Sequence, residues 1–180
     1  MKTTCSILLV GLACVFAANA QTTSSNSVPP EVIFTAGNTN AAAGTTVQIP
    51  ITATIQGIYP IRMLMLNLNV LPQAGAPAIP STTPVLFTPS AAVGGPTTTT
   101  NGISLSDSHG AGNYAAVWGL AGNGLGLTNA VNLIGTLSVS IPSWAPSGST
   151  YTVNFDHASA SPNGLASFPK LTVPGTITVQ

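Results

Sequence analysis

The sequence predicts an all-β protein whose mature part is one β-sandwich of about eight to nine strands. Short apolar and β-branched runs alternate with a period of two, and clusters of Gly, Pro, Asn and Ser separate these runs. No ten-residue stretch between them has the period of a helix, and no repeat recurs at a fixed spacing. Consecutive short strands without helical crossovers favour a sandwich or barrel over a parallel α/β sheet.

Two runs carry the strand pattern most clearly. In Thr46–Ile55 the odd-numbered residues are apolar and Pro50 lies on the other face. Proline cannot donate to a ladder, so this strand is expected at a sheet edge or at a bulge. In Ile61–Leu71 the even-numbered residues from Leu64 onward are apolar and should enter the core. The other expected strands are Glu31–Thr35, Val85–Thr88, Ile103–Ser106, Asn113–Leu120, Leu133–Ile141, Thr150–Phe155 and Thr176–Val179.

One long segment does not show the alternation of short strands and turns that is seen in the rest of the sequence. Pro72–Thr100 is rich in Pro, Thr, Gly and Ala and is interrupted only by Val85–Thr88. Segments of this length without regular structure are often functional loops or flaps, so this segment is notable, and its role is left open. The large side chains expected to fill the core are Trp118, Trp144, Tyr114, Tyr151 and Phe155.

Residues 1–20 have the features of a secretory signal peptide. Lys2 precedes a short apolar run, and Ala18-Asn19-Ala20 forms a small-x-small cleavage site. The apolar run is too short for a membrane span, and none is expected later in the chain. Residues 21–30 are polar and end in two prolines, so they are interpreted as a flexible lead-in to one domain over 31–180. The protein is therefore predicted to be secreted, with attachment to a bacterial cell surface left open.

Both cysteines lie in the predicted leader. A cut after Ala20 removes Cys5 and Cys14, so the mature chain would have neither a disulfide nor a cysteine nucleophile. The alternative is a lipidated Cys14, because Leu12-Ala13 precede it as a lipobox requires, although Gly11 stands where an aliphatic residue is expected.

Charge is scarce in the mature chain. Nucleic acids and anionic membranes are bound by clustered Lys and Arg, so both partner classes are excluded. A surface with almost no net charge is also poorly protected against self-association. The charged residues after the leader are Glu31, Arg62, Asp107, Asp156 and Lys170.

The few acidic and imidazole groups give weak signals for chemistry. Ser106-Asp107-Ser108-His109 has the residue types of a hydrolytic site, and Asp156-His157 places a carboxyl next to an imidazole. Sequence neighbours rarely form a catalytic triad, and metal sites require a ligand spacing that is absent here. We interpret both pairs as turn residues and expect no catalytic residue, no metal and no cofactor.

The odd-numbered side of Ile61–Leu71 is the predicted binding surface. Met63 and Met65 offer adaptable apolar contacts, and Asn67 and Asn69 offer hydrogen bonds, a combination that suits a protein interface. The alternative is that a loop covers this side and both faces are buried. The loop with Asp107 and His109 is a second candidate for partner binding.

Six stretches together resemble the cohesin family, whose extracellular sandwich modules bind dockerins in cellulose-degrading assemblies. Each stretch alone is common in β proteins, and their order and spacing over residues 31–179 carry the likeness. The resemblance implies a jelly-roll or cohesin-like sandwich that binds a protein partner and does not catalyse. The stretches are AGTTVQIPI at 43–51, Ile61–Val70, GNYAAVW at 112–118, LIGTLSVSI at 133–141, GSTYTVNF at 148–155 and GTITV at 175–179.

The sequence leaves three possible functions, one leading hypothesis and two alternatives. The leading hypothesis is a recognition or scaffolding module that binds a dockerin-like protein or joins a polysaccharide-degrading assembly. The first alternative is a structural subunit that self-assembles into an extracellular filament or matrix by strand addition. The second is a carbohydrate-binding module, which should present a flat row of exposed aromatic rings. Strand alternation assigns several of the candidate rings to the core, so we expect no sugar binding; the candidates are Tyr59, Tyr114, Trp118, Trp144 and Tyr151.

Overall fold

The fold is a sandwich of two β-sheets, seen in a computed structural model that describes residues 31–57, 60–101, 110–119, 121–122, 124–168 and 170–180. The five-stranded sheet has the order β10 (Lys170–Val173), β1 (Glu31–Ala36), β3 (Thr46–Gln56), β8 (Val131–Ser140), β5 (Leu86–Pro89). The six-stranded sheet has the order β2 (Thr39–Ala41), β11 (Gly175–Val179), β9 (Thr150–Ser161), β4 (Met63–Pro72), β7 (Asn113–Trp118), β6 (Thr98–Asn101). A 3-10 turn, η1 (Gly110–Gly112), precedes β7. The predicted all-β sandwich is confirmed.

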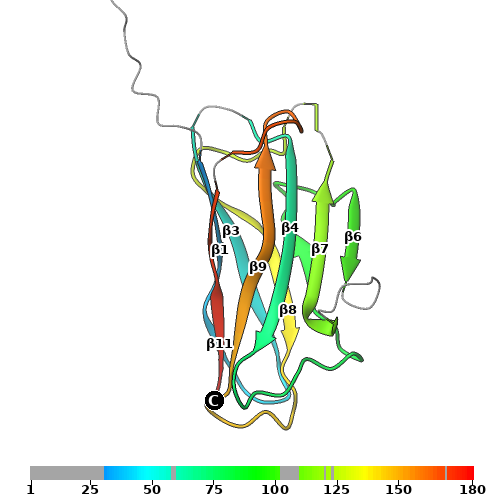
Figure 1. The fold of residues 1–180 in the computed structure, drawn as a ribbon, viewed down its shortest axis with the longest axis vertical. Coiled ribbons are helices and arrows are strands. Elements are labelled where there is room, and N and C mark those ends of the chain that lie inside the picture. The colour runs from blue at the N-terminus through cyan, green and yellow to red at the C-terminus, as the bar shows by residue number, and fades with distance from the viewer. Residues whose placement is uncertain (1–30, 58–59, 102–109, 120, 123, 169) are drawn as a thin grey trace, which may run out of the picture.

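Most neighbouring strands run antiparallel. The pairs β1 with β10 and β2 with β11 are parallel, and both join a strand from the start of the domain to one from its end. Figure 1 shows β9, β4, β7 and β6 side by side, with β3 and β8 in the layer behind them. The strand β4 therefore lies near the centre of the six-stranded sheet, with one face on the core and the other facing outward.

Alternation along β3 and β4 places the core as predicted. Leu64, Leu66 and Leu68 are completely buried, and Ile49 and Ile51 meet them from the other layer of the same core cluster. Three rings from two strands, β5 and β7, join the sheets on one side of this core. The Phe87 ring lies 5.2 Å from that of Tyr114 and 6.3 Å from that of Trp118, between ring centroids.

Pro50 sits in an inner strand, so the predicted edge position is wrong and the predicted bulge is confirmed. The strand β3 lies between β1 and β8, and its register against β8 shifts between Ile51 and Thr52. The ladder with β1 ends at Ala36, opposite Ile51. Pro50 follows this end of the ladder, and its carbonyl accepts a bond from the Gly37 amide at 2.9 Å, so its missing N–H removes no ladder bond.

The Pro72–Thr100 segment contains two short strands, β5 and β6, where the sequence predicted one. Ile79, Val85 and Val93 from this segment are buried in the core. The Trp118 indole also donates to the Gly94 carbonyl at 2.9 Å. These contacts attach the segment to the sandwich as part of its core. The expected strand Ile103–Ser106 lies outside the described residues.

Candidate functional site

The outward side of β4 forms the middle of the six-stranded sheet. Met63, Met65 and Asn67 are half-buried, and Asn69 is only 2% exposed. The strands on both sides contribute small side chains to the same side of the sheet. Met65 pairs with Val117 on β7 and with Ser159 on β9, and Asn67 pairs with Ala115 on β7. Small neighbours leave the two methionines as the largest apolar groups of this surface. We call it the central outer face: Met63, Met65, Asn67, Asn69, Asn113, Ala115, Val117 and Ser159.

A bulge in β9 brings an acid and an imidazole to the rim of this face. Asn67 pairs with His157 and Leu68 pairs with Phe155, so Asp156 is the extra residue of the bulge. Both Asp156 and His157 are exposed, and the Asn69 amide donates to the Asp156 carboxylate at 3.3 Å. The prediction that this pair lies in a turn is wrong, because β9 continues through it to Ser161. Bulges redirect side chains in this way and are frequent beside functional sites.

Three amide oxygens on this face are buried without a hydrogen-bond partner. They are the Oδ1 atoms of Asn67, Asn69 and Asn113. Asn69 and Asn113 face each other across β4 and β7, and Asn67 lies two residues away on the same side. An unsatisfied buried acceptor costs about 1–3 kcal/mol, so this cluster favours any group that can donate to it. The sequence could suggest Asn67 and Asn69 from alternation, whereas Asn113 joins them only through the register of β7.

The second predicted candidate, Asp107 and His109, lies outside the described residues. So does the Ser106–His109 stretch that has the residue types of a hydrolytic site. Among the residues that the structure describes, no group of three or more His, Cys, Asp and Glu side chains could hold a metal ion. Asp156 and His157 are consecutive in β9, and neighbours in sequence rarely have the geometry of a catalytic triad.

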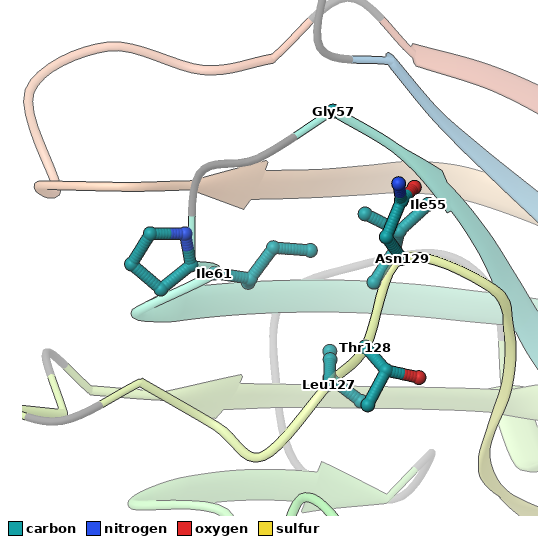
Figure 2. A pocket seen from close by; sticks show the side chains of 7 residues that line it. Ile55, Gly57, Ile61, Leu127, Thr128 and Asn129 are labelled. Carbon is teal, nitrogen blue, oxygen red and sulfur yellow. The ribbon is translucent and has the colours of Figure 1, made fainter.

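Two hollows lie at opposite ends of the sandwich. The first, about 370 Å³, is where β3 ends and β4 begins, and Figure 2 shows Ile55 and Ile61 beside the loop that carries Leu127, Thr128 and Asn129. Its remaining described lining residues are Gly57 and Pro60, and none of the described residues that line it is ionisable. The second, about 390 Å³, is where β3 begins and β8 ends, and Trp144 forms part of its wall.

Trp144 is 66% exposed, so its predicted place in the core is wrong. It lies in the loop that joins β8 to β9, where strand alternation does not apply. The next residue, Ala145, is 6% exposed and belongs to the core instead. The other aromatic residues predicted for the core, Trp118, Tyr114, Tyr151 and Phe155, are buried.

Solved structures of other proteins share this arrangement of strands. One is the third cohesin of ScaC from Acetivibrio cellulolyticus in complex with the ScaB dockerin, at TM-score 0.59 and 15% identity, covering 82% of this chain and 98% of that one. Another is the sixth cohesin of scaffoldin B from the same organism, in complex with a Cel5 dockerin, at TM-score 0.60 and 13% identity, covering 83% and 99%. The chain has the cohesin fold.

A non-cellulosomal cohesin from the archaeon Archaeoglobus fulgidus has the same fold at TM-score 0.56 and 10% identity, covering 83% of this chain and 91% of that one. No family model and no curated protein matches the sequence. The resemblance predicted from the six sequence stretches is therefore confirmed at the level of the cohesin-like sandwich. No helix within the described residues has the length and apolarity needed to cross a membrane.

Proposed function

We propose that this chain is a secreted, non-catalytic recognition module that binds a dockerin-like protein through the central outer face. One observation carries the proposal. Three amide oxygens without a hydrogen-bond partner lie on the same face as the half-buried, apolar side chains of Met63 and Met65. Cohesins of the same fold are seen in complex with dockerins, which supports a protein as the partner.

The chemistry of the face defines what a partner must supply. Methionine side chains adapt to an apolar surface, and interface cores are depleted in charge, as this face is. The amide oxygens of Asn67 and Asn113 accept only from donors such as hydroxyl, amide or ammonium groups. Asp156 and His157 at the rim add one carboxylate and one imidazole that restrict the partner's orientation.

Binding to a panel of purified dockerin modules, measured by calorimetry, tests the proposal. Met65→Lys and Asn67→Asp should each weaken binding at least about tenfold, because both put charge into a desolvated interface. The matched control is Thr54→Lys, which places the same charge on the outer side of β3 in the other sheet. No binding to any dockerin, or equal weakening by Thr54→Lys, would refute the proposal.

The five-stranded sheet supports self-assembly as a second candidate. Its outward side exposes Val131, Leu133, Leu171 and Val173 by 45–67%. Cross-strand pairs place Leu171 beside Ile33, and Val173 beside Thr35. Exposed apolar side chains on one sheet face mark interaction surfaces. Glu31 and Thr35 lie on the same side of β1 as Ile33, so this face is mixed in polarity. Sedimentation of the mature chain decides between the candidates, because a monomer at all concentrations would exclude the filament or matrix.

A further inference from the structure

The hollow beside Trp144 lies outside the surfaces that the two proposed functions use, and the exposure of Trp144 removes the reason for which no sugar binding was expected. It is lined by residues from three separate segments: the turn before β3, the 80–83 turn and the loop after β8. Among the aromatic residues that the structure describes, Trp144 alone is exposed. Figure 1 places this end of the sandwich at the bottom, near the C-terminus and far along the strands from the hollow of Figure 2. The lining residues are Gly44, Thr46, Pro80, Thr82, Thr83, Ser140, Ile141, Pro142, Ser143 and Trp144.

The loop that carries Trp144 is held in place by backbone bonds. The Ala145 amide donates to the Pro142 carbonyl at 3.0 Å, and the Gly148 amide donates to the Val179 carbonyl at 2.8 Å. The turn opposite is tied to the same strand end, since the Gly44 amide donates to the Ile141 carbonyl at 3.1 Å. A loop whose backbone is already held in this way loses little conformational entropy when a ligand covers it, which favours binding.

The polar groups of the hollow are hydroxyls. Thr46 and Ser140 bond to each other at 2.9 Å between their oxygens. Thr82, Thr83 and Ser143 make no side-chain hydrogen bond to any other part of the chain that the structure describes, so their donors and acceptors are free for a ligand. None of the described residues that line the hollow is ionisable. A phosphate, a carboxylate or a basic peptide would therefore find no opposite charge there.

We infer that this hollow binds a neutral saccharide, stacked on Trp144. A sugar ring has an apolar C–H face, which suits the indole, and a rim of hydroxyls, which can both donate to and accept from Thr82, Thr83 and Ser143. The volume of about 390 Å³ lies within the range of small-ligand sites. The site is separate from the central outer face, so it would let one domain hold a polysaccharide and a protein partner at once.

Co-sedimentation of the mature chain with insoluble neutral polysaccharides of different linkages tests the inference, together with fluorescence titration by the matching soluble oligosaccharides. The protein should bind at least one, and the bound sugar should protect Trp144 from quenching by acrylamide. Trp144→Ala should lower the affinity about tenfold or more, because it removes the stacking surface, whereas Trp144→Phe should keep part of it. Thr83→Val should weaken binding while keeping the side chain's shape.

Two controls separate this site from nonspecific adhesion. Leu165→Ala removes a side chain that is 94% exposed elsewhere, and Thr172→Val removes an exposed hydroxyl on β10. Neither should change sugar binding, and unchanged melting temperatures would show that all variants fold. Absence of binding to every polysaccharide, binding that survives Trp144→Ala, or binding only of proline-rich peptides would each overturn the inference. Sugar binding is measured without any protein partner, so its outcome is independent of the dockerin test.

Discussion

Replacing Leu66 by Ala should remove a large part of the stability of this domain. Leu66 is completely buried, and its neighbours in the sheet are Ala116 on β7 and Ala158 on β9, both 1% exposed. The substitution creates a row of three alanines, and neither neighbour is large enough to fill the space. Leu-to-Ala changes in cores cost about 2–5 kcal/mol, depending on how far the site collapses, so we expect about 4 kcal/mol here.

The matched change is Met65→Ala, one residue away on the opposite side of β4. Met65 is half-buried and lies between Val117 and Ser159, so we expect a cost of about 1 kcal/mol or less. Urea unfolding gives both free energies, and thermal melting should show the Leu66 variant lowered by roughly 8–16 °C. Equal losses for the two variants would refute the assignment of an open outer face. The recognition surface would then have to lie on the Pro72–Thr100 segment or on the loop with Asp107 and His109.

Four further outcomes are expected. Tyr151→Phe should raise the free energy of unfolding by about 1 kcal/mol, because the buried Tyr151 hydroxyl has no hydrogen-bond partner, and a loss in urea unfolding would contradict this. Burial also raises the pKa of Tyr151 and of Tyr114, so stability present below about pH 10 should be lost above it, and less steeply in Tyr151→Phe. Gly135→Ala should cost about 1–3 kcal/mol, since its Cβ would clash with the Phe87 ring, whereas Gly122→Ala, with open space around it, should cost little. Intact-mass measurement of the exported protein should show a chain that begins at Gln21, free or cyclised to pyroglutamate; a diacylated Cys14 would show that the leader was misinterpreted.

A strand can be predicted from the sequence where its two sides differ clearly in hydrophobicity. In β4 and β3 the inward residues are Leu, Ile and Val, so alternation alone identifies which side enters the core. In the second half of β9 the inward residues are Ala158 and Ala160, with serines between and after them. Small residues and an Asp-His pair resemble a turn more than a strand, and for this reason the expected strand stops at Phe155. The missed strands β2, β6 and β10 have only three or four residues each, too few for a period of two to be recognised.

Only part of the candidate site could be predicted from the sequence, because the rest depends on which residues of neighbouring strands face each other. Alternation identifies Met63, Met65 and Asn67 as one side of one strand. The sequence does not say that β7 pairs with β4 so that Asn113 faces Asn69, nor that a bulge turns Asp156 toward the same amide. Pairing partners and bulges are decided by contacts among strands that are far apart in the chain. The exposure of Trp144 escapes prediction for a related reason, since a loop residue has no alternation to follow and Ala145 takes the inward position.

The scarcity of charge gives the few polar features unusual weight. On a highly charged surface, one carboxylate and three amides would be a small share of the polar groups that a partner could contact. Here the described charged residues are Glu31, Arg62, Asp156 and Lys170, and Asp156 is the one that contacts the central outer face. In the proposed function, discrimination between partners would come from the positions of the donors that meet Asn67, Asn69 and Asn113, and from the fit to the methionines. A partner that lacks those donors leaves the acceptors unsatisfied, and this penalty, more than electrostatic attraction, is what makes such a face selective.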